Sequence, residues 1–150
     1  MRAVVQRVDR CGLIADGQPQ GEIEKGLLVL AGFQSSDDEK AMRYMIDKIA
    51  GLRIFEDENG HMNLSARDLG LSLYLVPNFT LYGDCRHGRR PGFSAGAPVA
   101  DAEPMFARFV ELARQEAGVP ILSGVFQAHM IIDPVLNGPV TLLIDSDKQF

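Results

Sequence analysis

Short apolar stretches rich in β-branched residues alternate with polar turns along most of the chain, a pattern that predicts strands. Arg2 to Val8 alternates weakly and carries three valines, which favours a strand. Leu13 to Asp16 and Gln20 to Ile23 lie on either side of Gly17, the arrangement of a β-hairpin. Gly26 to Phe33 is a continuous apolar run, so we expect a strand that is buried on both faces.

Two segments instead carry apolar residues at helical spacing. The first opens with Ser36-Asp37-Asp38-Glu39, which fits a capping box with the Ser36 hydroxyl at the N-cap, and it should end near Gly51. The second runs from Asp101 to Ala117, where Pro104 is tolerable only in the first turn. We therefore predict two helices.

The remaining apolar segments are short and predict further strands. These segments are Leu52 to Phe55, Leu71 to Val76, Val125 to Ile132 and Val140 to Asp145. The last two are separated by Leu136-Asn137-Gly138-Pro139, which is typical of a hairpin turn. The whole pattern predicts one domain over residues 1–150 with an α+β fold, in which a curved, barrel-like sheet is flanked by two helices.

Composition narrows the class of protein further. Apolar residues make up 46% of the 150 residues, enough for a substantial core. The net charge of -5 argues against indiscriminate nucleic-acid binding but leaves room for a local basic patch. Two cysteines, Cys11 and Cys85, are expected as free thiols in a reducing compartment. With no signal-peptide pattern and no apolar run of membrane-spanning length, we expect a cytoplasmic protein without a membrane partner.

The common catalytic and cofactor motifs are missing from the sequence. It has no GxSxG, HExxH or P-loop, and its three histidines stand apart from other metal-ligating residues, so we expect neither a metal nor a cofactor. Basic residues cluster once, at Arg86, His87, Arg89 and Arg90, in a Gly-rich loop over Asp84 to Pro98. This cluster is either an ordinary charged loop or an arm that contacts the phosphates of an RNA end.

Two short segments stand out. Pro77 to Leu81 ends a strand and enters a turn, a geometry that can aim consecutive backbone N–H groups at one point and so hold a carbonyl oxygen. Within it Thr80 offers a hydroxyl, but without a nearby base this would be a weak nucleophile. The second segment, Asn137-Gly138-Pro139, holds an X-Pro bond, where the cis state is accessible, although a hairpin turn is the simpler interpretation.

Together with their neighbours, these segments resemble the D-aminoacyl-tRNA deacylase family over essentially the whole chain. Many matching blocks occur in one order, which makes the resemblance specific. The blocks are Met1-Arg2-Ala3-Val4-Val5-Gln6-Arg7-Val8, Leu52-Arg53-Ile54-Phe55-Glu56-Asp57, Met62-Asn63-Leu64-Ser65, Phe79-Thr80-Leu81-Tyr82-Gly83-Asp84, Gly88-Arg89-Arg90-Pro91 and Gly138-Pro139-Val140-Thr141.

The resemblance implies a homodimer that binds the 3′ end of aminoacyl-tRNA at the subunit interface. The 77–81 segment of one subunit would face Gly138-Pro139 of the other, and a cis bond there would crowd the side where an L side chain projects. Arg7 would brace this motif. Phe126 and Met130 would line the pocket of the terminal adenosine, although core packing is an alternative role for both.

The family resemblance also implies a reaction without a protein base. A ribose hydroxyl of the terminal adenosine would assist hydrolysis of the ester. The main-chain amides of Asn78, Phe79 and Thr80 would hold the carbonyl as charge develops on it. We therefore predict Asn78, Phe79 and Thr80 as catalytic, and Arg7, Pro77, Phe126, Met130, Asn137, Gly138 and Pro139 as substrate-binding.

The chain departs from the usual family motifs at both segments. Pro77-Asn78 replaces the usual Ser-Gln, and Leu136-Asn137 precedes Gly138-Pro139 in place of Asn-Asp. These features are similar to animal-type relatives, which carry a trans Gly-Pro bond and a roomier pocket for small L-amino acids. Arg7 and the Gly88-Arg89-Arg90-Pro91 loop are instead similar to the standard branch. Three hypotheses follow: a D-aminoacyl-tRNA and glycyl-tRNA deacylase, an editor with relaxed chirality, and a non-catalytic dimer that binds tRNA ends.

Overall fold

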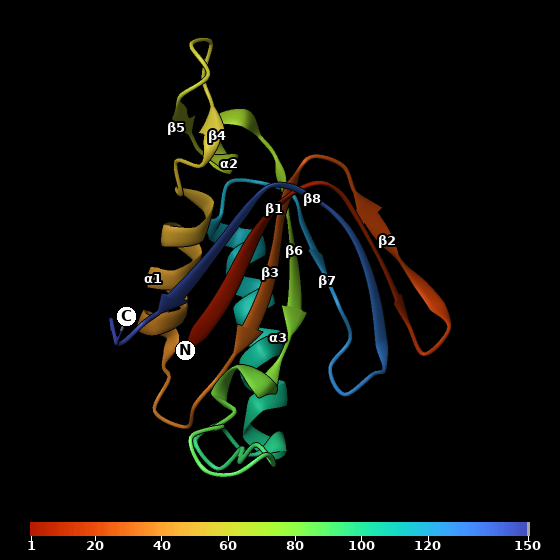
Figure 1. The fold of residues 1–150 in the computed structure, drawn as a ribbon, viewed down its shortest axis with the longest axis vertical. Coiled ribbons are helices and arrows are strands. Elements are labelled where there is room, and N and C mark those ends of the chain that lie inside the picture. The colour runs from red at the N-terminus through yellow and green to blue at the C-terminus, as the bar shows by residue number, and fades with distance from the viewer. Residues whose placement is uncertain (150) are drawn as a thin grey trace.

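The computed structural model describes residues 1–149 and shows a strongly bent mixed sheet with two long helices packed beside it (Figure 1). The strands are β1 (Arg2–Ala15), β2 (Gln18–Ile23), β3 (Gly26–Gly32), β4 (Phe55–Glu56), β5 (Met62–Leu64), β6 (Ser72–Pro77), β7 (Ile121–Ser123) and β8 (Met130–Asp145). The helices are α1 (Glu39–Ala50), α2 (Ala66–Leu69), the 3₁₀ helix η1 (Phe79–Tyr82) and α3 (Val99–Glu116). The predicted α+β class with a curved, barrel-like sheet is confirmed; the four-residue helix α2 is an element that the sequence pattern did not indicate.

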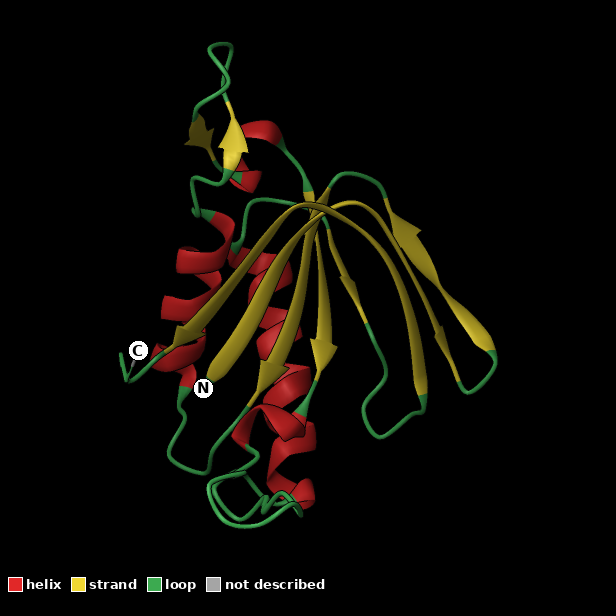
Figure 2. Ribbon diagram, in the orientation of Figure 1, coloured by secondary structure: helices red, strands yellow, loops and turns green. Residues whose placement is uncertain are grey.

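Strand β1 organises the sheet because it pairs along both of its edges. On one edge β8 runs antiparallel to it from Arg2 to Ala15. On the other edge β3 pairs with its first half and β2 with its second half, both antiparallel. Strands β6 and β7 then extend the sheet beyond β3 in parallel. Figure 2 shows how β1 and β8 arch together, so that the second half of β1, the first half of β8 and β2 lean away from the helices.

The bent sheet buries apolar side chains on both of its faces. On the helix side, Val29 and Leu75 pack with residues of α1 and α3 such as Met45 and Phe109. On the opposite face, Leu28 and Tyr74 belong to a second cluster. Strand β3 therefore contributes to both clusters, which confirms the prediction that its apolar run is buried on both faces.

The expected hairpin turn at Leu136-Asn137-Gly138-Pro139 is wrong. These residues lie within the single strand β8, which pairs with β1 on both sides of them. The ladder is irregular between Gln6 and Val8 and again between Val8 and Arg10. Pro139 has no N–H to donate, and an irregular stretch is where a long strand accommodates such a residue. Of the expected strand Val125 to Ile132, the part before Met130 is loop.

The helix starts also differ from the prediction. Asp38, rather than Ser36, is the N-cap of α1, and its carboxylate accepts a hydrogen bond from the Ala41 N–H at 2.8 Å. Helix α3 begins at Val99, so Pro104 lies beyond its first turn, where it removes one internal hydrogen bond. No helix in residues 1–149 is long and apolar enough to cross a membrane.

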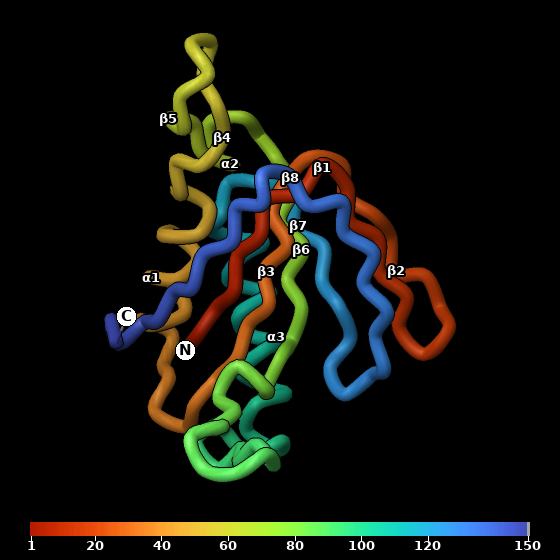
Figure 3. Tube along the Cα trace, in the orientation of Figure 1, coloured from red at the N-terminus to blue at the C-terminus, as the bar shows by residue number. Residues whose placement is uncertain are grey.

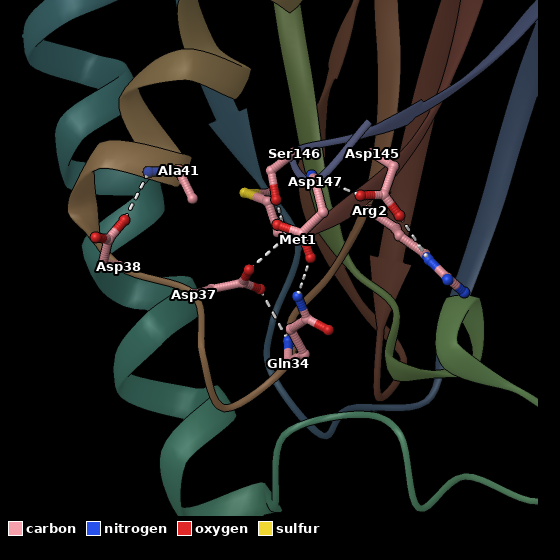
Figure 4. Close-up of polar contacts among 9 residues, drawn as sticks. All are labelled: Met1, Arg2, Gln34, Asp37, Asp38, Ala41, Asp145, Ser146 and Asp147. Atoms are coloured by element: carbon pink, nitrogen blue, oxygen red, sulfur yellow. Dashed lines mark hydrogen bonds and ion pairs between the residues drawn. The ribbon is translucent and has the colours of Figure 1, made fainter. Parts of the chain in front are cut away.

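Asp37 is unavailable to the helix because it binds the start of the chain (Figure 4). The α-amino group of Met1 is buried and contacts the Asp37 carboxylate and the Ser146 hydroxyl. The second carboxylate oxygen of Asp37 accepts the Gln34 N–H at 2.9 Å. We refer to Met1, Gln34, Asp37 and Ser146 as the N-terminal cluster; it joins β1, the loop before α1 and the end of β8.

Candidate active site

The segment predicted to be catalytic lies at the carboxyl end of β6. Pro77 is the last residue of this strand and pairs with Ala31 of β3. The Asn78 N–H donates to the Ala31 carbonyl at 2.7 Å, and the chain then turns into η1. In Figure 3 this stretch leaves one edge of the sheet beside the first turns of α3. Pairing with β3 thus holds the start of the segment in place, and the 3₁₀ helix η1 sets the backbone conformation of the rest.

Among the three main-chain amides of the segment, one has no partner. The Asn78 amide is used by the sheet, as described above. The Asn78 side-chain oxygen accepts the Thr80 N–H at 3.2 Å and also the Thr80 hydroxyl. The Phe79 N–H makes no hydrogen bond to any of residues 1–149. Phe79 is the first residue of η1, and the first amides of a helix point outward without internal partners.

A cavity of about 410 Å³ opens beside this segment, within the size range of small-molecule sites. It brings together five of the predicted site residues, and no side chain that lines it is titratable. Gly124 packs closely behind it, since an added Cβ there would lie 2.8 Å from the Met130 sulfur. The lining residues are Pro77, Asn78, Phe79, Ala97, Val99, Ala102, Phe126, Gln127, Ala128 and Met130.

Arg7 lies elsewhere, against the irregular stretch of β8. Its side chain is 6% exposed and donates to the Asn137 carbonyl at 3.2 Å and to the Asn137 side-chain oxygen at 2.9 Å. It also donates to the Ile54 carbonyl, which ties the stretch to the chain before β4. The Gly138-Pro139 peptide bond is cis, the state that the family resemblance implies. Arg7 therefore contacts the segment that it was expected to brace.

One chain does not bring the two predicted halves of the site together. Ala3, Ala31 and Pro77 lie on one rung of the sheet, across β1, β3 and β6. Arg7, which holds the Gly138-Pro139 segment, lies four residues further along β1, a spacing of about 13 Å along a strand. Strand β8 is on the other edge of β1, so two further strands separate it from β6. Neither Gly138 nor Pro139 lines the cavity.

Charged groups gather in the loop after η1 rather than in the cavity. Arg86 forms an ion pair with Asp84 at 2.7 Å. The hydrogen bonds that the Arg86 side chain and backbone N–H donate to the Asp84 carboxylate hold its pKa well below the usual value. Arg89 and Arg90 are exposed and bind no other group in residues 1–149. Nor do three His, Cys, Asp or Glu side chains in this range come close enough to hold a metal ion.

The sequence interpretation missed the role of the Asn78 side chain. Asn78 is the N-cap of η1, and its carboxamide occupies the Thr80 amide that was expected to face the substrate. The signal was present, because Asn is among the strongest N-cap residues and readily bonds the backbone two residues ahead. Phe93 was also missed, although its ring contacts that of Phe79.

Comparisons with known proteins give this geometry a context. The chain is 51% identical to the D-aminoacyl-tRNA deacylase of Clostridioides difficile and 48% identical to that of Thermotoga petrophila, with both chains covered in full. The solved structure of the c-Myc DNA Unwinding Element Binding Protein matches at 34% identity, with a TM-score of 0.89 over 97% of this chain and 98% of that one. A probable eukaryotic D-amino acid tRNA deacylase shares the fold, with a TM-score of 0.77 at 19% identity over 95% and 97% of the two chains.

These matches define the class as deacylases, which are hydrolases. The model of the family described as D-Tyr-tRNA(Tyr) deacylase matches residues 4–145. The chain belongs to this family, and the family predicted from the sequence is confirmed.

Proposed function

We propose that the protein hydrolyses the ester bond of D-aminoacyl-tRNA and glycyl-tRNA and releases the free amino acid. One observation carries the chemical part of this proposal. An unpartnered main-chain amide, that of Phe79, lies beside a cavity whose lining offers no titratable side chain. A site of this kind holds a carbonyl oxygen by hydrogen bonding and needs its proton transfer from elsewhere.

The substrate itself supplies the missing group in this mechanism. The terminal adenosine binds in the cavity against Phe126 and Met130, which places the ester next to the Phe79 N–H. The neighbouring ribose hydroxyl assists the attack of water on the carbonyl carbon, which gives a tetrahedral oxyanion held by the Phe79 N–H. When this oxyanion collapses, the C–O bond of the ester breaks, and the proton lost by the water passes to the leaving ribose oxygen. One oxyanion donor contributes about 3–4 kcal/mol, and orientation contributes roughly 7–11 kcal/mol more.

The second part of the proposal is a homodimer in which the partner supplies the chiral selection. Gly138-Pro139 of one subunit would approach the cavity of the other and reject L side chains by steric conflict. Two observations support it: one chain keeps the two segments apart, and Arg7 holds the Asn137 backbone in a defined position. In addition, β8 exposes a series of large apolar side chains that a subunit contact would cover, namely Ile131, Val135, Leu136 and Leu143.

The decisive experiment removes the Phe79 N–H without removing any hydrogen bond within the protein. Proline fits the first position of a helix, and Asn78 already has the extended backbone that a following proline requires. We expect Phe79→Pro to lower kcat by about 10²–10³ relative to Phe79→Ala, which keeps the N–H and loses the same ring. Equal kcat values for the two variants would exclude this amide as the oxyanion donor.

Substrate choice is tested with tRNA charged with D-Tyr, Gly or L-Ala. The proposal predicts release of D-Tyr and Gly and much slower release of L-Ala. Comparable rates for D-Tyr and L-Ala would contradict the chiral part alone. If none of the three substrates is hydrolysed while tRNA still binds, the protein is a binding module and the enzymatic proposal fails.

A further inference from the structure

Two exposed aromatic rings meet at the mouth of the cavity. The rings of Phe79 and Phe93 are in edge-to-face contact, with centroids 5.2 Å apart and an angle of 66° between their planes. They are 61% and 41% exposed, although large aromatic side chains normally lie inside a protein. Phe79 also lines the cavity, whereas Phe93 does not. The pair, which we call the aromatic ledge, therefore continues the cavity wall outward.

Backbone contacts hold the ledge in place. The Asp84 and Gly92 backbones exchange two hydrogen bonds, of 2.7 and 2.9 Å, which close the loop just before Phe93. Gly83 lies against the ring, since an added Cβ there would lie 3.1 Å from Phe93 Cε1. After the ring, the Ala97 N–H donates to the Phe33 carbonyl at 2.9 Å. Phe93 thus protrudes from an anchored stretch of chain.

The closed loop beside the ledge carries positive charge that the protein does not use. Arg86 is committed to Asp84, but Arg89 and Arg90 have no hydrogen-bond or ion-pair partner in the described residues. The chain as a whole has a net charge of -5, so this concentration of arginine is local. Exposed aromatic rings next to unpaired arginines are the combination that proteins use for single-stranded nucleic acid, where bases stack and phosphates are neutralised.

We propose that the aromatic ledge binds the nucleotides that precede the terminal adenosine in the single-stranded 3′ end of the tRNA. A base stacks on Phe93, and Arg89 and Arg90 contact the phosphates on either side of it. The inference rests on the proposed function, since it assumes that the adenosine occupies the cavity; the next nucleotide then leaves over Phe79. RNA is favoured over a second copy of this chain because exposed rings lie next to the arginines, and only a nucleic acid offers bases to stack on the rings together with phosphates for the arginines.

The test compares two substrates that differ in the nucleotides concerned. One is D-tyrosyl-tRNA, and the other is adenosine esterified with D-tyrosine, which lacks the preceding nucleotides. We expect Phe93→Ala to lower the preference in kcat/KM for the tRNA over the adenosine ester by about tenfold, the size of effect typical of a lost base stack. Phe93→Tyr keeps a ring and should restore the preference. Met62→Ala, which removes another exposed apolar side chain, is the matched control.

Several results would overturn the proposal. Equal losses on both substrates would mean that Phe93 supports the cavity or the fold, and an unchanged preference would mean that no base stacks on it. A changed oligomeric state of Phe93→Ala in sedimentation would make the ledge a subunit contact.

Binding of the oligonucleotide 5′-ACCA-3′ separates this inference from the proposed function. Phe93→Ala should weaken that binding even if the protein proves to lack hydrolytic activity. Arg89→Gln should reduce the slope of log K against log salt by about 0.7, the contribution of one phosphate on a single strand. An unchanged slope would remove Arg89 from the site.

Discussion

Two regions at the same end of the sheet differ in how their polar groups are hydrogen-bonded. In the N-terminal cluster, the buried α-amino group of Met1 has two partners, and both carboxylate oxygens of Asp37 accept hydrogen bonds. At the same end of the sheet, two strands across from β1, the Phe79 amide has no partner within residues 1–149, and two aromatic rings remain exposed. Arg2 links the regions, since its guanidinium lies 4.6 Å from the centroid of the Tyr82 ring in η1.

The difference separates what stabilises the fold from what is left for a ligand. A buried charge is tolerated when it is paired and hydrogen-bonded, and removing one partner is then costly. An unpartnered amide at the surface costs little, because water satisfies it until a substrate displaces the water. Substitutions in the cluster should therefore change stability without changing chemistry, and substitutions in the segment after β6 should do the reverse.

The largest effect is expected for Asp37→Ala, which leaves the buried α-amino group without its carboxylate. We predict a loss of about 3–5 kcal/mol in the free energy of unfolding, measured by chemical denaturation. The kcat of the remaining folded protein should be unchanged. Asp38→Ala is the neighbouring control, because Asp38 caps α1 and its loss should cost about 1 kcal/mol. A smaller loss for Asp37→Ala than for Asp38→Ala would refute the contrast between the regions.

Arg7→Met should have an intermediate effect on stability and also lower activity, because Arg7 hydrogen-bonds to Asn137 and Ile54 and supports the proposed site. Loss of its donors leaves the buried Ile54 carbonyl without this partner, at a cost of about 1–3 kcal/mol in unfolding free energy. Activity should fall as well.

Mixing Arg7→Met with Phe79→Pro subunits should restore about a quarter of the wild-type sites, since half of the dimers are then mixed and each mixed dimer regains one of its two sites. No recovery in verified mixed dimers would show that both segments act within one subunit.

The smallest effect is expected for Thr80→Ala. The Thr80 hydroxyl donates to the Asn78 side chain and has no base beside it, so it should not act as a nucleophile. We predict that kcat falls by less than about tenfold, whereas loss of a true acid–base group typically costs 10²–10⁴. Complete inactivity with normal folding and tRNA binding would contradict the mechanism.

Much of the fold could be predicted from local sequence because several signals are local in origin. The apolar run of β3 identifies a doubly buried strand without reference to its neighbours. The turn signal at Asn137-Gly138-Pro139 predicted a hairpin turn, and this was wrong because the signal is local and the structure there is not. It is a short-range preference, whereas the path of β8 is fixed by pairing with β1, whose paired residues lie more than 110 positions away in the sequence. A long-range contact also lies next to the start of α1, because Asp37 binds the α-amino group of Met1. The helix is capped by Asp38, the residue after this contact, and not by Ser36.

Five of the ten predicted site residues line one cavity, whereas their hydrogen bonds were not predicted. Family resemblance indicated Pro77, Phe126 and Met130, and the fold brings all three to one cavity. Which amide remains open depends on the cap formed by Asn78, which its residue type signalled, and on the pairing of β6 with β3, which no short motif encodes. The ledge formed by Phe79 and Phe93 likewise depends on the closure of the loop between them.

The pairing of β1 with β8 has a consequence for how the chain is made. Arg2 pairs with Asp145, so one edge of β1 stays unpaired until β8, which comes after all the other strands in residues 1–149, is available. Contacts of such sequence separation form slowly, and a chain released early exposes an unpaired strand edge to other chains. Fragments that stop before residue 130 should thus be far more prone to aggregation than residues 1–150, because the sheet cannot close without β8.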